Sequence, residues 1–259
     1  MRNIIKAINF ELVRSKSVFI FYSIFAVIMG LIAGLNIEKD AGTSGMILES
    51  PTSVTMFPVF VCAMIVAYIC CPDMRDRVSN YEIMSGHSRL KFYLARCFYA
   101  VGISALFTTI LSFVPMIIGN IFFGWGDKLV LSDVIIRQIL LFFPYLRLAA
   151  FFVLLSFLVK NEYIVMAAGF ITCLAPSIIS GIVKTSLNIY ISIFNLNLLM
   201  DMGGWKIYNI SPTKGVITYQ VGESMITPGL VIGTIAASVI MAVIYTALGY
   251  ALFRKNDIN

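Results

Sequence analysis

The sequence has little charge for its length. Charged residues make up 12% of its 259 residues, whereas 59% are hydrophobic and the mean hydropathy is +0.92. Soluble domains usually carry about 25% charged and about 45–50% apolar residues. The composition therefore argues against an ordinary soluble globular domain and is typical of a membrane protein.

The side chains and motifs of common enzymes are also scarce. His87 is the single histidine, so neither an HExxH motif nor a histidine-rich metal site can form. There is no GxxxxGK[ST] phosphate loop, and no GxSxG serine lies in an apolar segment. We therefore expect a chain that is not an enzyme, with no catalytic residues, no metal site and no cofactor of its own.

Cysteines are few and lie within apolar segments or at their ends. They are Cys62, Cys70, Cys71, Cys97 and Cys173. None lies in a long polar loop, so a disulfide framework is not expected. Cys70 and Cys71 are adjacent and lack the spacing of zinc ligands. The sequence predicts buried thiols.

Six apolar segments are long enough to cross a membrane, for which a helix needs about 20 residues. They are residues 17–35, 54–71, 97–123, 134–159, 163–183 and 228–253. The third and fourth are long, and we expect them to tilt or to bend at Pro115 and Pro144. The sequence thus predicts an all-α membrane protein with a single transmembrane domain over residues 1–259.

The distribution of lysine and arginine predicts the orientation. If the N-terminus is inside, the inner segments hold 12 of the 19 basic residues, the outer segments hold 6, and Arg147 lies inside a span. Because basic residues gather in cytoplasmic loops, both termini are expected in the cytoplasm. No basic face with interleaved aromatic residues stands free of the apolar segments, so we expect no nucleic-acid partner.

Two further segments are expected at the membrane surfaces. Residues 1–16 contain an apolar stripe at helical spacing, formed by Ile4, Ile5, Ile8 and Leu12. The polar residues Arg2, Lys6 and Asn9 lie outside this stripe. This pattern predicts an amphipathic interfacial helix, the alternative being a plain positively charged flank. Residues 184–227 are too long for a simple loop and are rich in apolar residues, so we expect an amphipathic or re-entrant helix there.

Arg147 lies near the middle of the fourth span, where insertion scales give an arginine a cost of about 2.5–3.5 kcal/mol. None of the six spans contains Asp or Glu. The functional hypothesis is that Arg147 faces a watery cavity or meets an anionic substrate or lipid headgroup. The alternative is that Pro144 breaks the helix, and that Arg147 then bonds the freed carbonyls or snorkels to an interface.

Two stripes recur at four-residue steps in the first and second spans. Ala26, Gly30 and Gly34 allow a close helix contact, either in a dimer or with another span of the same chain. The second stripe is Phe60, Met64 and Tyr68. It predicts a soft apolar wall along a substrate pathway, with ordinary helix packing as the alternative.

Much of the charge gathers in residues 73–96, between the second and third spans. This stretch holds Asp73, Arg75, Asp76, Arg77, Glu82, His87, Arg89, Lys91 and Arg96. A short charged loop in so apolar a chain is expected to contact a soluble partner.

The order of these elements resembles the permease subunits of type-2 ATP-binding-cassette (ABC) exporters over the whole chain. The match in the charged stretch consists of Asp73, Tyr81-Glu82-Ile83, Gly86, Ser88-Arg89 and Arg96, although lysine is commoner at the last position. A second match is the end of the final span, an aromatic residue followed by basic residues and Asp-Ile: Tyr250, Phe253, Arg254, Lys255, Asp257 and Ile258.

The resemblance implies partners and a coupling site. Two permeases would pair, either as a homodimer or with a related permease, above two copies of a separate ABC ATPase that holds ATP and Mg²⁺. Residues 75–86 would form a cytoplasmic coupling helix, along which Asp73 and Arg77 could pair. Tyr81 and Ile83 would be its apolar anchors. Spans two and five would line the pathway, and the segment after span five would form a re-entrant outer cap.

We therefore expect a permease subunit of an ATP-driven exporter in a bacterial cytoplasmic membrane. Its cargo would be hydrophobic or amphipathic, such as a peptide, a lipid-like molecule or a drug, with antimicrobial-peptide export or immunity as the favoured role. The alternative is a stand-alone channel or ion-coupled carrier, which usually needs acids or histidines within its spans. An intramembrane enzyme or a membrane sensor partner is a further alternative.

Overall fold

The structure is a computed structural model, and it describes a defined part of the chain. The described residues are 5–6, 8–10, 19–20, 23–24, 27–28, 42–44, 51–75, 88–127, 129–182, 205–210, 219–224 and 228–255. Of these, residues 51–57, 73–75, 173–182, 205–210, 219–224, 230 and 255 are described by their backbone alone.

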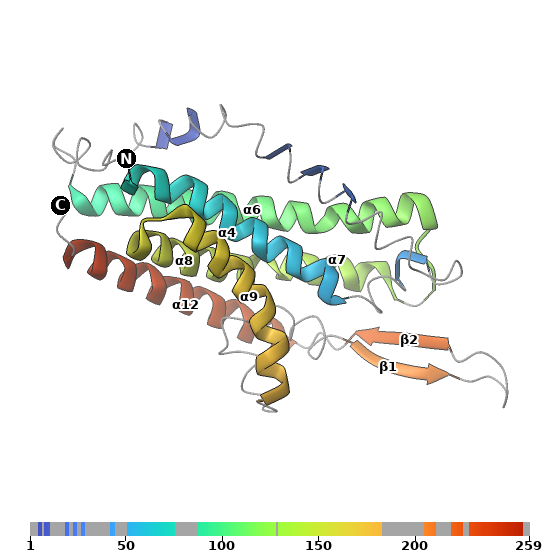
Figure 1. The fold of residues 1–259 in the computed structure, drawn as a ribbon. Helices are drawn as coiled ribbons and strands as arrows, with labels where there is room; N and C mark the ends of the chain where they lie inside the picture. Colours follow the sequence, from blue (N-terminus) through green and yellow to red (C-terminus); the bar gives the residue numbers. More distant parts are fainter. Residues whose placement is uncertain are drawn as a thin grey trace.

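Long helices that run side by side make up most of the structure (Figure 1). They are α4 (Pro51–Arg75), α6 (Arg89–Phe123), α7 (Leu131–Leu140), α8 (Phe142–Val159), α9 (Glu162–Ile182) and α12 (Pro228–Lys255). Within the described residues, three stretches are long and apolar enough to cross a membrane: Arg89–Phe123, Leu131–Val159 and Val231–Arg254. The predicted membrane character therefore agrees with the lengths and compositions of these helices.

Helix α8 lies at the centre of the bundle. It packs extensively against α4, α6 and α12, and less extensively against α7 and α9. Tyr145, Leu148 and Phe152 of α8 are at most 1% exposed and form much of the core. Helix α4 in turn packs closely against α9, where a Cβ added to Gly169 would collide with the side chain of Ala63. A glycine is needed there because the two backbones approach closely.

The fourth predicted span is divided between two helices. Helix α7 ends at Leu140, Leu141 forms a turn, and α8 begins at Phe142. Pro144 explains the break, because it has no N–H to donate and its ring clashes with the carbonyl group four residues earlier, that of Leu140. Helix α6, by contrast, continues through Pro115 without ending.

A small β-sheet is an exception to the all-α prediction. Strands β1 (Trp205–Ile210) and β2 (Tyr219–Ser224) pair antiparallel, with Trp205 opposite Ser224. Both strands lie in the region predicted to hold an amphipathic or re-entrant helix. Trp205–Ile210 is rich in aromatic and β-branched residues, which are enriched in strands.

Candidate coupling end and substrate pathway

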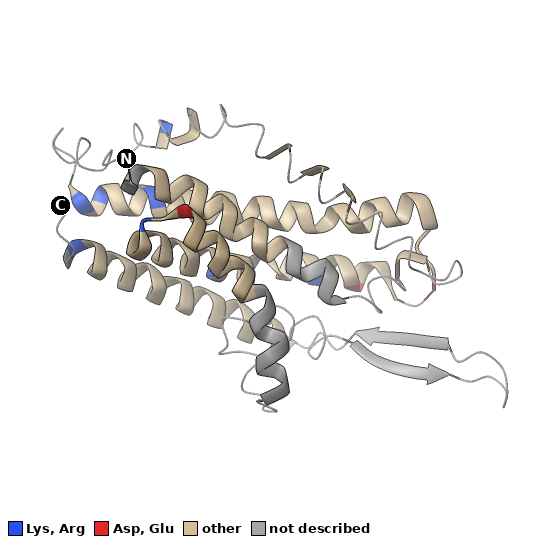
Figure 2. Ribbon diagram, viewed as in Figure 1, with Lys and Arg blue, Asp and Glu red and all other residues tan. Residues whose placement is uncertain are grey.

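Basic side chains gather at one end of the helix bundle, here called the basic end (Figure 2). Arg89 and Lys91 lie in the first turn of α6, Lys160 follows α8, and Arg254 lies in the last turn of α12. The side chains of Arg89, Lys91 and Arg254 are exposed. Of the described acids, Asp127 follows α6 and Asp133 lies in the first turn of α7, at the opposite end, whereas Glu162 opens α9 two residues after Lys160. Basic residues thus outnumber acids at the basic end (Figure 2). The charge distribution therefore distinguishes the two ends of the bundle.

The charged stretch of residues 73–96 is only partly a loop. Asp73 and Arg75 belong to the last turn of α4. Arg89 opens α6, where the hydroxyl of the N-cap residue Ser88 accepts a hydrogen bond from the Lys91 backbone N–H at 3.3 Å. The remaining candidate coupling residues lie outside the described part of the chain: Arg77, Tyr81, Glu82, Ile83 and Gly86.

Two arginines lie deeper than the sequence suggests. Arg96, expected at the border of the loop, is 2% exposed, and its guanidinium carbon lies 4.6 Å from the ring centroid of Phe92. Arg96 thus lies in the bundle interior, where its guanidinium makes a cation–π contact with the Phe92 ring. Arg137, counted with an outer segment in the sequence, is buried in α7 and interacts electrostatically with Asp133 one turn earlier.

An aromatic cluster joins α6, α8 and α12 just inside the basic end. Its members are Phe92, Tyr93, Phe157, Tyr250 and Phe253. The ring centroid of Tyr93 lies 4.7 Å from that of Phe157 and 5.6 Å from that of Tyr250. The Tyr93 hydroxyl donates a hydrogen bond to the backbone oxygen of Thr246 at 2.9 Å. Each aromatic pair adds about 0.5–1.5 kcal/mol beyond its burial, so the cluster holds the three helix ends together.

This cluster is not among the features predicted from the sequence, although the sequence contains a signal for it. Aromatic residues are enriched where membrane-crossing helices reach the interface. Aromatic residues near the first residue of α6 and the last residues of α12 fit that pattern, but their pairing depends on which helices are neighbours.

The predicted pathway stripe lies on α4. Phe60, Met64 and Tyr68 are half-buried at successive four-residue steps. At Phe60 the stripe meets α9, since the ring of Phe60 packs edge-on against that of Phe170 with centroids 6.5 Å apart. The stripe therefore begins at the interface of α4 and α9, the two helices that correspond to the second and fifth predicted spans.

Arg147 is 2% exposed and lies in the second turn of α8. Its charge interacts with Tyr245 of α12, whose ring packs edge-on against Phe151 at 5.6 Å. This burial argues against the alternative in which Arg147 snorkels to an exposed interface. Phe60 and Arg147 thus contact different helices, α9 and α12 respectively.

The described N-terminal residues lie along α6. Ile8 is buried, and the side-chain oxygen of Asn9 accepts a hydrogen bond from the Tyr99 hydroxyl at 2.9 Å. The Phe19 ring packs edge-on against Phe107, with centroids 5.0 Å apart. Ile4 and Leu12 of the expected amphipathic stripe lie outside the described residues, as do Ala26, Gly30 and Gly34 of the first span.

Four cysteines of the described core are buried thiols outside any disulfide, as predicted: Cys62, Cys70, Cys71 and Cys97. Within the described residues no three potential metal ligands gather at one place. Comparisons of the chain with protein-family models, with curated proteins and with solved structures found no match.

Proposed function

We propose that this chain is the permease subunit of an ATP-driven exporter in a bacterial cytoplasmic membrane. It crosses the membrane six times with both termini in the cytoplasm, pairs with a second permease copy, and works with two copies of a separate ATPase that holds ATP and Mg²⁺. The observation that supports this proposal best is the basic end. The two helices that flank residues 76–88 end there, beside the exposed charges of Arg89, Lys91 and Arg254.

In this mechanism the ATPase docks on residues 75–86. Closure of the ATPase moves the adjoining ends of α4 and α6. Tyr93 of α6 contacts Phe157 of α8 and Tyr250 of α12, so a displacement of α6 would be passed to both helices. Helix α4 packs closely against α9, so the same displacement would change the α4–α9 interface. Alternating access would follow from these two linked movements.

The chemistry of the apolar segments favours a hydrophobic or amphipathic cargo. Phe60, Met64 and Tyr68 supply a flexible, polarizable wall on α4, and methionine adapts to cargo of irregular shape. The six spans contain no acid or histidine that could couple transport to an ion gradient. A peptide, a lipid-like molecule or a drug fits this wall, and antimicrobial-peptide export or immunity is the role we favour. In this scheme Arg147 holds an anionic group of the cargo.

The proposal predicts that a neighbouring gene encodes an ATPase with a GxxxxGK[ST] loop. Co-purification of that ATPase with this chain, followed by ATP turnover and export assays in vesicles, tests the proposal. The coupling variant replaces Tyr81, Glu82 and Ile83 by alanine together. If even one of them is an interface hot spot, costing at least about 2 kcal/mol, association falls by about 30-fold or more. The matched control is Asp127→Ala, at the end opposite to the basic end, which should leave association unchanged.

The possible results separate the proposal from its alternative. If the triple variant binds the ATPase as well as the original chain does, the docking site is misplaced. If no ATPase co-purifies and the vesicles transport cargo only under an imposed ion gradient, the chain is an ion-coupled carrier and the exporter proposal is wrong.

A further inference from the structure

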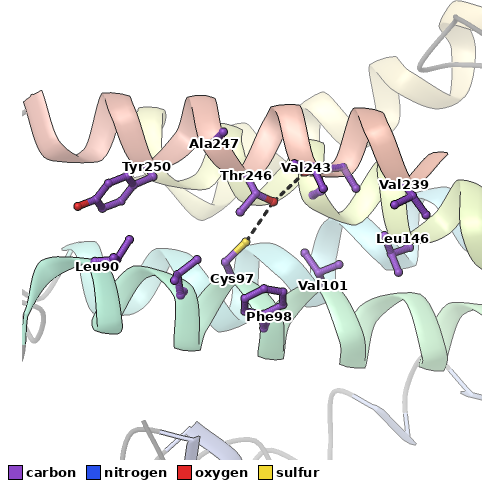
Figure 3. A pocket seen from close by; sticks show the side chains of 13 residues that line it. Leu90, Cys97, Phe98, Val101, Leu146, Val239, Val243, Thr246, Ala247 and Tyr250 are labelled. Carbon is purple, nitrogen blue, oxygen red and sulfur yellow. Dashed lines mark hydrogen bonds between the residues drawn. The ribbon is translucent and has the colours of Figure 1, made fainter. Parts of the chain in front are cut away.

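A groove of about 460 Å³ runs between α6 and α12 (Figure 3). Both helices pack on α8 but make few contacts with each other, so Leu146 and Ala150 of α8 form the floor of the groove. The volume lies within the range of about 300–1,000 Å³ that is usual for small-molecule sites. The groove is therefore large enough to hold a ligand.

The lining of the groove favours an aliphatic ligand. Its side chains are almost entirely apolar, and two of its polar atoms already contact each other: the Cys97 sulfur lies 3.7 Å from the Thr246 hydroxyl oxygen. That hydroxyl also donates to the backbone oxygen of Ala242 at 2.8 Å. The rim residues Phe98 and Val243 are 68% and 62% exposed, so the groove opens sideways, toward lipid if α6 and α12 cross the membrane.

The length and position of the groove match one leaflet of a bilayer. Leu90 and Tyr250 line one end, and Val101 and Val239 line the other (Figure 3). With a rise of about 1.5 Å per residue, each wall is about 16 Å long. This is about half of the ~30 Å thickness of the hydrocarbon core. The groove starts at the basic end, so it covers the depth of the leaflet on that side.

The charges at the same end identify the headgroup. Arg89 and Lys91 flank Leu90, and Arg254 lies one helical turn beyond Tyr250. All three side chains are exposed, and neither α6 nor α12 contains an acidic residue. An anionic headgroup would thus meet three basic side chains in the sequence neighbourhood of the groove, with no carboxylate on either helix.

From the depth, lining and charge together, we propose that this groove binds one anionic phospholipid of the leaflet at the basic end. An acyl chain lies between α6 and α12, and the phosphate meets Arg89, Lys91 and Arg254. This inference goes beyond the export proposal. It requires that the chain lies in a membrane, but no ATPase and no particular cargo.

The test uses the full chain in phosphatidylcholine vesicles that contain a trace of a phospholipid with a photoreactive acyl chain. The probe is either anionic phosphatidylglycerol or zwitterionic phosphatidylcholine, and mass spectrometry locates the labelled residues after irradiation. We expect the anionic probe to label residues 90–101 and 239–250 more strongly than the zwitterionic probe does. Arg254→Gln should reduce this preference about fivefold, because each basic residue near the surface attracts anionic lipid by that factor.

Two variants test whether the preference belongs to the groove. Ala247→Trp, which fills the groove, should abolish anionic labelling there but leave labelling near Ile110, beyond the groove on α6, unchanged. Lys6→Gln, a basic residue outside α6 and α12, should leave the preference intact. Equal labelling of the original chain by both probes would overturn the proposal, as would a Lys6→Gln effect as large as that of Arg254→Gln. Cross-linking of the groove to a second copy of the chain in place of lipid would also overturn it.

Discussion

Helices α8 and α12 are almost equally apolar but are packed very differently. The segments that contain them, Leu131–Val159 and Val231–Arg254, have mean hydropathies of 2.1 and 2.2. Yet 61% of the apolar stretch is buried inside the chain in the first, and only 17% in the second. Hydropathy therefore identifies both helices as apolar but does not reveal which is the core of the bundle and which is at its edge.

The sizes of the buried side chains explain the difference. Helix α8 buries large residues such as Tyr145 and Phe152. The buried residues of α12, apart from Phe253 at its end, are small: Thr234, Ser238, Ala242 and Gly249. Small residues let two helix backbones approach closely. Several larger apolar residues of α12, such as Ile240 and Val243, are exposed, whereas Tyr245 and Tyr250 pack against rings of α8 and α6. Helix α8 is thus buried through large side chains, whereas α12 buries mainly small residues and adds ring contacts along one side.

The largest expected effect is the removal of a core side chain from α8. Phe152→Ala deletes a completely buried ring, and such a deletion destabilises a protein by about 3–5 kcal/mol. The control is Ile240→Ala on α12, which is 58% exposed and should cost no more than about 0.5 kcal/mol in detergent. Denaturant unfolding of the two purified variants measures both losses of stability. Similar losses in the two variants would show that α12 is packed as tightly as α8, contrary to our comparison.

A functional effect is expected where the two helices meet through Arg147 and Tyr245. If Arg147 holds an anionic group of the cargo, Arg147→Leu removes a charged hydrogen bond of about 1.5–3 kcal/mol, which weakens cargo affinity roughly 10- to 150-fold. Expression should remain normal, because leucine is cheaper than arginine to place within a membrane. Transport in vesicles over a range of cargo concentrations measures the change. Arg147→Lys keeps the charge and should retain much of the affinity, whereas unaltered transport by Arg147→Leu would refute the cargo-binding role.

The sequence predicts the helices better than it predicts their neighbours. Helices α4 and α12 occupy the apolar runs 54–71 and 228–253, because a long apolar run without acids favours a continuous helix. Regular spacing likewise places Phe60, Met64 and Tyr68 on one face of α4. Local spacing, however, does not show that Arg147 meets Tyr245, which lies far along the chain.

Burial at helix ends is equally hard to predict from local sequence. Arg96 ends the charged stretch of residues 73–96 in the sequence but lies over Phe92 inside the bundle. The groove between α6 and α12 arises because both helices pack extensively on α8 and only sparsely on each other. The pairing of Trp205–Ile210 with Tyr219–Ser224 also depends on contact between separated residues. Each of these features is set by tertiary packing, which composition and periodicity do not record.

A smaller loss of stability is expected from closing the space at Gly249 of α12. A Cβ there would collide with the Tyr93 hydroxyl of the aromatic cluster, so Gly249→Leu should destabilise the chain by about 1–3 kcal/mol. Gly102→Leu on α6 is the matched control, because no atom lies within 4 Å of a Cβ at that position. Both substitutions gain the same helix propensity, which cancels when their unfolding curves are compared. If both glycines tolerate leucine equally, the close fit of Gly249 against the Tyr93 side chain does not hold α12 in place.

The smallest expected loss of stability is that of Tyr93→Phe. It shows how much the Tyr93 hydrogen bond contributes compared with the close fit of Gly249 against the same side chain. Tyr93→Phe keeps the ring stacking of the aromatic cluster but removes the hydrogen bond to the Thr246 backbone oxygen, at a cost of about 0.5–1.5 kcal/mol. Tyr99→Phe removes a similar bond to Asn9 in an exposed setting and should cost less, because water replaces the partner. Denaturant unfolding of the two variants measures the difference. If Tyr93→Phe costs more than Gly249→Leu, the hydrogen bond to Thr246 and not the close fit at Gly249 fixes α12 against Tyr93 of α6. Helices α8 and α12 would then differ mainly because a hydrogen bond holds α12, and not because their buried side chains differ in size.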